Sequence, residues 1–391
     1  MDRSTGFPRG AALDVATLTA APYGSLAAMR AEEPVSWVPA LGAWFVTRRD
    51  LAIDAMVDAD RFTVADDRFT TAQVLGTSML NLDGPEHVRH RRAFVQPFRP
   101  RFLREVLEER IAERATRLLA STLDGSHELR TGLAGPLAVE TILDVLGLHD
   151  LASSDVLGWY GAFGDAITAL TVGCDVPPEV SDTLAHLHTY VGSAMDSNDA
   201  GFITQLVADE VLTNDEIPAA VAVVMFGAIE TSEAMTSNAF WHLFTNPAVL
   251  DRLRADRAFL PRVIDESLRL EPAASWVDRY TTTDVELGGI SIPTGELVTI
   301  NLLAANRDPD VFDDPDVFDI DRPNPTQHVT WAQGPHTCLG LHVAKAETAA
   351  AITALLDAED AHNHRFELDA EHSSPPSGLI FRKPDAVKLH G

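Results

Sequence analysis

Hydrophobic positions recur every three or four residues along most of the 391-residue chain, which predicts a mainly helical protein. Near the start, residues 35–47 instead alternate apolar and small side chains around a glycine and predict a β-hairpin. Helices are expected over 51–60, 85–98, 101–123, 138–148, most of 153–198 apart from a break at 172–179, a stretch ending near 272, and 341–357.

The segment from Thr213 to Asn246 predicts the longest helix. Thr213 and Glu216 have the spacing of a capping box, and Asn246 precedes a proline that would stop the helix. A helix of about 34 residues would be about 50 Å long. Its first half is apolar on nearly every face, so we expect it to be buried on all sides.

The pattern changes to period two in the last third of the chain. Residues 284–287 and 290–292 flank two glycines and predict a hairpin, and 296–308 predicts a further strand. Terminal strands are expected at 364–368 and 378–383. With no repeat or Gly/Ser linker, we expect one domain over residues 1–391, mainly α with small β-sheets (α+β).

Composition restricts the possible partners. The chain is 46% hydrophobic and 23% charged, as in soluble globular proteins, and its net charge of -28 opposes binding to nucleic acid or anionic membranes. Two cysteines without a CxxC pair exclude a disulfide framework and a four-thiolate zinc site. No signal peptide or membrane span is recognisable, so we expect a cytoplasmic monomer.

The segment Trp331–Gly340, WAQGPHTCLG, holds Cys338 just before a predicted helix. Helix amides and the helix dipole could favour the thiolate, and the neighbouring glycines and proline would form a tight loop. Such a thiolate would act as a nucleophile or as a metal ligand. The alternative is a small buried apolar residue that happens to be cysteine.

Polar residues inside the long helix form a second candidate. Thr231 can donate its hydroxyl hydrogen to the carbonyl of Gly227, which would open the helix locally. Glu230 beside it could supply protons to a bound, reduced oxygen species. The alternative is a kinked core helix in which Glu230 is paired elsewhere.

Two further groups are charged. Glu266 and Arg269 form a helical i,i+3 pair, and Arg322 downstream could join the same carboxylate and fix the cysteine loop. Four potential cations could bind a ligand with two propionates, the alternative being a solvated basic face. They are His87, Arg91, Arg279 and His336.

In this order, H-x-x-x-R, G-A-x-E-T-S, E-x-x-R, F-D-x-x-R and G-x-H-x-C-x-G, the motifs resemble those of the soluble bacterial cytochrome P-450 family of haem-thiolate monooxygenases. The resemblance implies that Cys338 ligates the iron of haem b (iron protoporphyrin IX), where a thiolate favours O–O cleavage. It also implies that Glu230 and Thr231 deliver protons. His87, Arg91, Arg279 and His336 would bind the propionates, and Glu266, Arg269 and Arg322 would form a structural triad.

Two residues depart from the family pattern. Trp331 stands where the cysteine motif usually begins with Phe, which would alter packing near the sulfur. Ala228 occupies the oxygen-groove position that is usually Gly, so the groove would be tighter. Because Glu230 and Thr231 remain, O2 activation is favoured over a mechanism that uses only peroxide.

The resemblance further implies a small, largely apolar substrate and a separate ferredoxin or flavodoxin with its reductase, so that NAD(P)H acts only indirectly. Six arginines in residues 85–104, against one glutamate, could dock that acidic partner or be merely solvated. Candidate substrate contacts are Val74, Leu75, Val224, Ala273, Trp276, Leu379 and Ile380.

Three other functions remain open. A haem-thiolate enzyme could use peroxide or dehydrogenate its substrate, and a non-catalytic haem sensor would have little use for the Glu230–Thr231 pair. A hydrolase built on Cys338 and His336 would leave the arginine and glutamate motifs unexplained.

Overall fold

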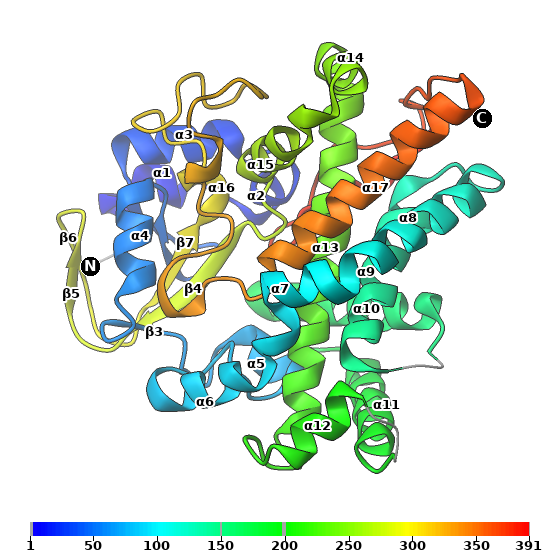
Figure 1. Ribbon diagram of the computed structural model, residues 1–391. Coiled ribbons are helices and arrows are strands. Elements are labelled where there is room, and N and C mark those ends of the chain that lie inside the picture. The colour runs from blue at the N-terminus through cyan, green and yellow to red at the C-terminus, as the bar shows by residue number, and fades with distance from the viewer. Residues whose placement is uncertain (1–2, 149–150, 198–200, 391) are drawn as a thin grey trace.

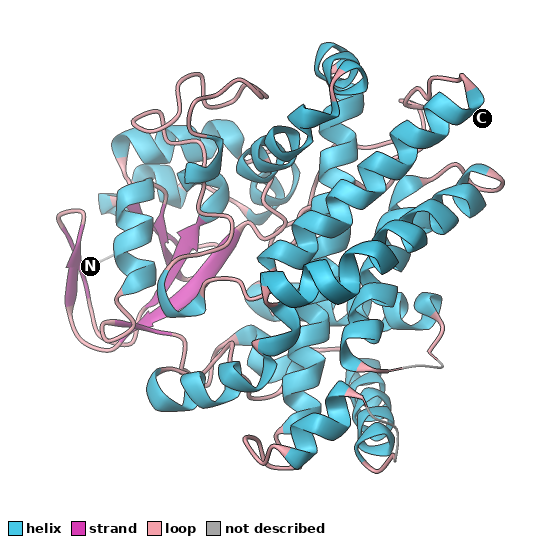
Figure 2. Ribbon diagram, viewed as in Figure 1, coloured by secondary structure: helices cyan, strands magenta, loops and turns pink. Residues whose placement is uncertain are grey.

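The computed structural model describes residues 3–148, 151–197 and 201–390. Helices make up most of it, and the strands gather at one side, as Figures 1 and 2 show. The fold is therefore mainly α with small β-sheets, as predicted. The core consists of a large apolar cluster among the helices and a smaller one between the main sheet and α4, Arg49–Val57.

The helical elements, with short 3-10 and π turns marked η, are η1 Arg3–Gly6, α1 Pro8–Ala11, α2 Val15–Ala20, α3 Tyr23–Glu32, α4 Arg49–Val57, α5 Thr70–Leu75, α6 Gly84–Phe94, η2 Gln96–Phe98, α7 Pro100–Phe102, η3 Leu103–Leu107, α8 Glu108–Leu123, η4 Arg130–Ala134, α9 Gly135–Leu146, α10 Ser153–Thr171, α11 Pro178–Met195, α12 Phe202–Ala208, α13 Ile217–Thr245, α14 Pro247–Ala255, η5 Arg257–Phe259, α15 Leu260–Leu270, α16 Leu302–Ala305, η6 Pro325–Gln327, η7 Gly334–His336 and α17 Leu341–His362.

The main sheet has the strand order β1-β2-β7-β4-β3. Its strands are β1 Val35–Val38, β2 Ala43–Val46, β3 Phe62–Thr63, β4 Trp276–Thr281 and β7 Leu297–Asn301. The β2–β7 pair is parallel, whereas the other pairs are antiparallel. The sheet therefore joins the predicted N-terminal hairpin to strands from the last third of the chain. A separate hairpin consists of β5 Val285–Leu287 and β6 Ile290–Ile292, as predicted.

Helix α13 forms the axis of the helical part, with α17 running beside it (Figure 1). It has 29 residues, which gives about 44 Å, and it begins at Ile217 rather than at Thr213. Only half of the predicted capping box forms: the Thr213 amide donates to Glu216 Oε2 at 2.8 Å, and the turn before the helix stays outside it. The helix is long and apolar enough to cross a membrane, but 67% of its most apolar window is buried inside the protein.

Several sequence predictions were wrong in extent. The strand expected over 296–308 ends at Asn301, whose side chain accepts a 2.8 Å hydrogen bond from the Ala304 amide and caps α16. The segments 364–368 and 378–383 make only isolated bridges: Leu368 pairs with Leu389, Phe381 with Ala274, and Lys383 with Ser377. The helix expected over 101–123 is interrupted by the π turn η3.

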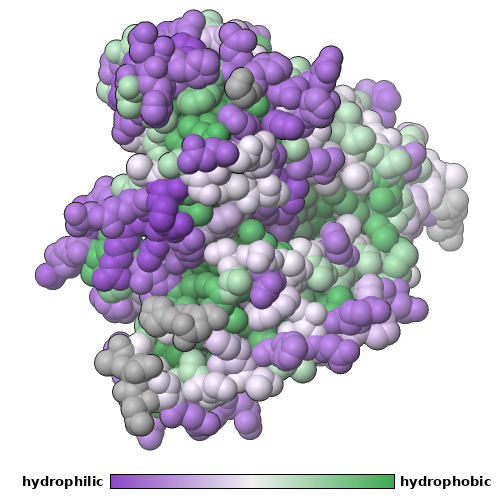
Figure 3. Space-filling model, turned by 90° about the vertical axis from the view of Figure 1, so that its right-hand side faces the viewer, coloured by the Kyte–Doolittle hydropathy of each residue, from purple (hydrophilic) through white to green (hydrophobic). Residues whose placement is uncertain are grey.

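The outer surface matches the acidic, polar composition. Figure 3 views one face of the molecule and shows hydrophilic side chains over much of its outer layer, with hydrophobic ones mainly in recesses between them. Most of the buried apolar residues belong to the two core clusters beneath this surface.

Candidate functional site

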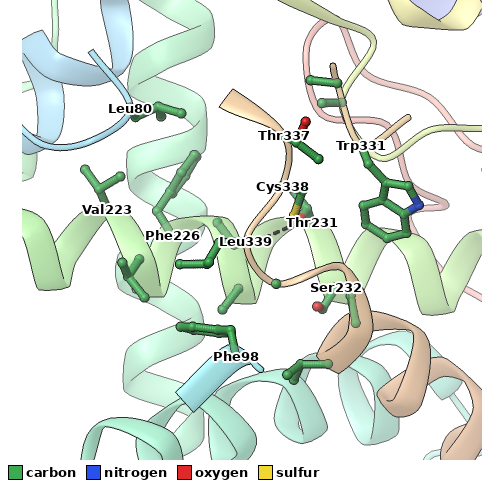
Figure 4. Close-up of a pocket in the computed structure, with 18 of the residues that line it drawn as sticks. Leu80, Phe98, Val223, Phe226, Thr231, Ser232, Trp331, Thr337, Cys338 and Leu339 are labelled. Carbon is green, nitrogen blue, oxygen red and sulfur yellow. Dashed lines mark hydrogen bonds between the residues drawn. The ribbon is translucent and has the colours of Figure 1, made fainter. Parts of the chain in front are cut away.

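The loop Trp331–Gly340 presents the Cys338 sulfur to an internal cavity. Gly334 has φ +76°, and a Cβ at this position would lie 2.9 Å from the Met56 carbonyl oxygen, so glycine is required here. The Cys338 amide donates a 2.8 Å hydrogen bond to the Trp331 carbonyl oxygen and closes the loop. The Trp331 indole nitrogen points away from Cys338 (Figure 4), so this ring adds bulk near the sulfur without an N–H aimed at it.

The electrostatics of Cys338 argue against a free thiolate nucleophile. Burial raises the pKa of the thiol, although hydrogen bonds from the Gly340 and Leu341 amides act in the opposite direction. The start of α17 therefore does not produce a thiolate by itself, and a nucleophile would need a lowered pKa. His336 bonds Asp83 at 2.8 Å rather than the sulfur. A metal cation bound to the sulfur would displace the proton.

The cavity has a volume of about 300 Å³ and lies between the cysteine loop and α13 (Figure 4). Cys338 and Thr231 both line it. Most of the other lining side chains are apolar. They include Val223, Val224 and Phe226 of α13, together with Leu80, Ala274 and Val277. The site therefore combines one thiol with a largely apolar chamber.

Thr231 makes the hydrogen bond expected from the sequence. Its hydroxyl donates to the Gly227 carbonyl oxygen at 2.5 Å, four residues earlier. The helix continues without a break through this position. Ala228 also lines the cavity, and its methyl group narrows the space beside Thr231.

Glu230 lies one position earlier and faces away from the cavity. It is 5% exposed and is absent from the cavity lining. The Lys383 ammonium donates to Glu230 Oε1 at 2.7 Å and to Glu233 Oε2 at 2.6 Å. Burial raises the pKa of Glu230, and Lys383 lowers it in part. The sequence left two interpretations open: proton delivery by Glu230 and Thr231, or a core helix with Glu230 paired elsewhere. In the structure Glu230 is paired with Lys383, as in the second interpretation, whereas Thr231 faces the cavity, as in the first.

The three members of the expected triad are brought together by the fold. Arg269 donates to both carboxylate oxygens of Glu266 at 2.9 and 2.7 Å, and Arg322 Nε donates to the same carboxylate at 3.2 Å. All three side chains are almost completely buried. Both guanidiniums also donate to carbonyl oxygens of the segment 306–317. The triad therefore ties the meander that precedes the cysteine loop to α15.

Of the four potential cations, Arg91 and His336 line the cavity, whereas His87 lies against His336 and Arg279 interacts electrostatically with Asp83, the partner of His336. The His87 and His336 rings lie 4.4 Å apart, and Arg91 donates to the Thr337 carbonyl oxygen at 2.7 Å. Burial lowers the pKa of His87 to about 4 and that of Arg279 to about 10. At neutral pH His87 therefore offers an N–H donor, whereas Arg279 keeps its charge.

Two of these groups have unsatisfied donors. His87 Nε2 and Arg279 Nη2 are buried and have no hydrogen-bond partner among the described residues. A buried donor without an acceptor costs about 1–3 kcal/mol, so both atoms fit an anionic ligand. Together with the Cys338 sulfur and the apolar walls, they suit a flat apolar group that carries carboxylates and a metal. The residues fit haem, and with the fold they define a haem-thiolate protein.

The substrate contacts expected from the sequence are mostly outside the cavity. Val224 lines it. Trp276 does not, because it packs against Phe45 at 5.7 Å on the opposite face of β4 from Val277, which does line it. The buried residues Val74, Leu75, Ala273, Leu379 and Ile380 are likewise absent from the lining.

Sequence reasoning missed several lining residues. Ala274 and Val277 are one position from Ala273 and Trp276, and strand alternation could have found them had the register been known. Met79 and Leu80 lie in a loop with no periodic signal. Glu347 also lines the cavity, and burial raises its pKa to about 8. The sequence could have indicated Glu347, because it lies nine residues after Cys338 and on the buried face of α17.

Comparisons with known proteins agree with the site. The family described as "Cytochrome P450" matches residues 180–379. Cytochrome P450 107B1 of Saccharopolyspora erythraea is 32% identical over 353 residues, covering 83% of this chain and 85% of that protein. The vitamin D(3) 25-hydroxylase of Pseudonocardia autotrophica is 30% identical, with coverage of 85% and 84%.

Solved structures share the fold. The crystal structure of CalO2 has a TM-score of 0.83 at 26% identity, covering 94% of this chain and 95% of that one. CYP109E1 from Bacillus megaterium in complex with testosterone has a TM-score of 0.84 at 23% identity, with coverage of 96% and 99%. The chain belongs to the cytochrome P450 family. It is therefore a haem-containing oxidoreductase of the monooxygenase class.

Proposed function

We propose that this protein inserts one oxygen atom from O2 into a small, neutral, largely apolar organic substrate. The observation that carries the proposal is that the Cys338 sulfur and the Thr231 hydroxyl line the same apolar cavity. When bound, haem b would supply the activation of O2. The residues of this chain would hold the haem, exclude water and move protons.

Haem binding would use Cys338 and the basic residues near its loop. Cys338 would ligate the iron as a thiolate, and the metal would offset the burial that otherwise keeps the thiol protonated. Arg279 and Arg91 would pair with the propionates as cations, and His87 would donate one N–H. His336 would donate through Nδ1, since its Nε2 is engaged with Asp83.

Thr231 and Glu230 would manage protons on the α13 side. The Thr231 hydroxyl hydrogen is held by the Gly227 carbonyl, so its oxygen remains free to accept a hydrogen bond from the cavity. Glu230 would relay protons from the side of α13 on which it meets Lys383. Because it faces away from the cavity, its carboxyl group would have to rotate or pass its proton through water.

The substrate class follows from the lining. The residues of α13 that line the cavity carry no charged side chain, and burying an unpaired ion against them would cost several kcal/mol. Phe226 limits the available length, because it packs against Phe381 at 5.2 Å and so is held in place. We therefore propose small neutral substrates with few polar groups.

Electrons would come from a separate ferredoxin or flavodoxin and its reductase, with NAD(P)H acting only through them. Support comes from α6, whose Arg91 contacts the cysteine loop while Arg92 is exposed, and from the exposed Arg99 nearby. These cations would attract an acidic partner close to Cys338. We also propose that residues 1–391 form one domain that acts as a cytoplasmic monomer.

The test is the absorption spectrum of the purified protein, reduced with dithionite and exposed to carbon monoxide, for wild type beside Cys338→His. A strongly red-shifted Soret band in wild type that is lost in the variant is expected. An absence of haem, or a band that is the same in both proteins, would refute the proposal.

A peroxide-driven oxidation is the second candidate, and the orientation of Glu230 and the methyl group of Ala228 favour it. Thr231→Ala separates the two. An enzyme that uses O2 should release more peroxide and form less product per electron, whereas a peroxide-driven enzyme should be nearly unaffected. Thr245→Ala is the matched control, because its hydroxyl makes the same bond, to Trp241 O at 2.7 Å, away from the cavity.

A further inference from the structure

Three side chains of the kind that bind metals meet between α6 and the segment that leads into α13. Glu86 and His90 lie four residues apart on α6, and Glu216 comes directly before Ile217, the first residue of α13. One potential ligand atom from each of the three lies within 4.8 Å of the other two. Residues four apart share one face of a helix, so Glu86 and His90 meet Glu216 together.

The centre of this cluster holds a positive charge. Arg89 Nη2 lies 2.7 Å from Glu86 Oε2 and 2.6 Å from Glu216 Oε1. The same nitrogen lies 3.1 Å from His90 Nε2. One polar atom of each potential ligand thus contacts a single guanidinium nitrogen, which marks the position that a cation prefers. Because Arg89 brings one positive charge against two carboxylates, the cluster keeps an excess of negative charge.

His90 presents a lone pair to this centre. A guanidinium N–H only donates, so His90 Nε2 accepts from Arg89 and the ring proton is on Nδ1. Nδ1 is buried and has no hydrogen-bond partner among the described residues. The residue is 2% exposed, and burial lowers the pKa of the imidazole, which keeps it neutral at neutral pH. Neutral imidazole is the form that binds a metal ion.

The two carboxylates differ in freedom. Glu216 Oε2 accepts from the Thr213 amide at 2.8 Å and from Arg89 Nη1 at 2.9 Å, so its position is fixed. The hydrogen bonds from Arg89 also hold the pKa of Glu216 well below its usual range. The Glu86 side chain is 58% exposed and closes the cluster toward solvent. An ion can therefore enter, and Arg89 can leave, on the side of Glu86.

We propose that Glu86, His90 and Glu216 bind Zn²⁺ in place of the Arg89 guanidinium, and that the ion joins α6 to the start of α13. Zinc accepts carboxylate and imidazole ligands, with water at a fourth position. The imidazole disfavours Mg²⁺ and Ca²⁺, which prefer oxygen ligands. A dication also neutralises both carboxylates, whereas Arg89 neutralises one. None of the three ligands lines the cavity, so the site is separate from that of the proposed oxidation.

The test is a calorimetric titration of the holoenzyme with ZnCl₂, after treatment with EDTA and removal of any histidine tag. Wild type should bind one equivalent of zinc, and MgCl₂ should give no saturable heat. His90→Leu should weaken zinc binding at least about tenfold, because the nitrogen ligand is lost. Arg89→Met should instead strengthen it at least about tenfold, because the competing cation is gone. These opposite effects distinguish a metal site from an ion-pair cluster.

Two more variants control for folding and for other histidines. Glu86→Gln changes an exposed side chain and should weaken binding as His90→Leu does, even where the variants of the less exposed residues fold poorly. His372→Gln should leave binding unchanged. His372 also contacts a carboxylate, Asp369 Oδ2 at 2.7 Å, but within the described residues it belongs to no cluster of three metal-binding side chains.

Two further measurements locate the ion. X-ray absorption at the zinc edge should show nitrogen and oxygen ligands only, and saturating zinc should raise the midpoint of thermal unfolding of wild type but not of His90→Leu. A sulfur ligand, no saturable binding by wild type, or equal affinities in wild type, His90→Leu and Glu86→Gln would overturn the proposal.

The outcome is independent of the test of function. A protein with the red-shifted carbon monoxide band but without the zinc site would refute only the zinc site. A protein that binds zinc as described but lacks the band would refute only the proposed function.

Discussion

Glu347 is a buried carboxyl group that has no counter-ion among the described residues. It is 3% exposed, and burial raises its pKa from 4.5 to about 8, although interaction with the Ser232 hydroxyl lowers it in part. A carboxyl group whose pKa is higher in the folded protein than in the unfolded chain makes its full contribution to stability at pH values below the pKa of the unfolded chain. That contribution is lost as the pH rises from 4.5 toward 8, at about 1.4 kcal/mol per pH unit.

Glu347→Gln should therefore flatten the dependence of stability on pH in this window and make the protein more stable than wild type at its upper end. The free energy of unfolding of the holoprotein, from denaturant titrations at several pH values, measures this. Glu367→Gln removes an exposed carboxylate of the same type and should leave the slope unchanged. Parallel curves for wild type and Glu347→Gln would contradict the prediction.

The residue scale also shows the limit of reasoning from the sequence. The Thr231–Gly227 hydrogen bond was predicted and is confirmed, because it depends only on helical spacing. The direction of Glu230 was left open, since it depends on Lys383, 153 residues later. Trp276 was expected to contact the substrate but does not line the cavity, whereas its neighbour Val277 does, because adjacent residues on a strand face opposite sides.

At the scale of elements, the triad is a buried connection between α15 and the meander that precedes the cysteine loop. Arg322→Met would leave the buried Glu266 with one guanidinium and remove the hydrogen bond to the Asp314 carbonyl oxygen. Losing one partner of a buried ion pair costs about 3–5 kcal/mol. We expect a lower midpoint of thermal unfolding and faster loss of haem, followed by the Soret absorbance.

Arg252→Met provides the comparison for this experiment. Arg252 forms a bidentate pair at 2.7 and 2.9 Å with Asp321, the residue that precedes Arg322 in the chain. Unlike the triad, both side chains of this pair are exposed. Such a pair contributes about 0–1 kcal/mol. If Arg322→Met and Arg252→Met reduced stability equally, the triad would not be the anchor of the meander.

Elements with strong local signals were predicted well, and those set by distant partners were not. Helix α13, the break between α10 and α11 and both hairpins follow from periodicity and turn residues. Strand β4 was missed, because it exists through pairing with β7 and with β3, which lies more than 200 residues earlier. Strand β7 ends at Asn301 because the side chain of this residue caps the following helix, and the apolar pattern of the sequence does not reveal such a cap.

At the scale of the whole molecule, a strongly acidic protein has a local excess of arginine close to its cysteine loop. Arg92→Glu with Arg99→Glu should raise the ferredoxin concentration needed for half-maximal reduction on the order of tenfold at low salt, and less at high salt. The reduction rate of the haem at varied ferredoxin and ionic strength measures this.

The control is Arg252→Glu with Arg257→Glu, which changes the net charge equally on two other helical elements, α14 and η5. If both double variants behaved alike, general repulsion would explain the effect and the docking surface would have to lie elsewhere.

The groups that hold the haem enter the chain at widely separated times during synthesis. His87 and Arg91 are made early, Arg279 follows nearly 200 residues later, and Cys338 comes last. At roughly 5–20 residues per second, the ribosome needs roughly 13–50 s to pass from His87 to Cys338. The parallel pairing of Trp44 with Val298 also waits for that length of chain. Haem capture therefore cannot be completed before Cys338 has been made, and strand β2 has no β7 partner until Val298 has been made.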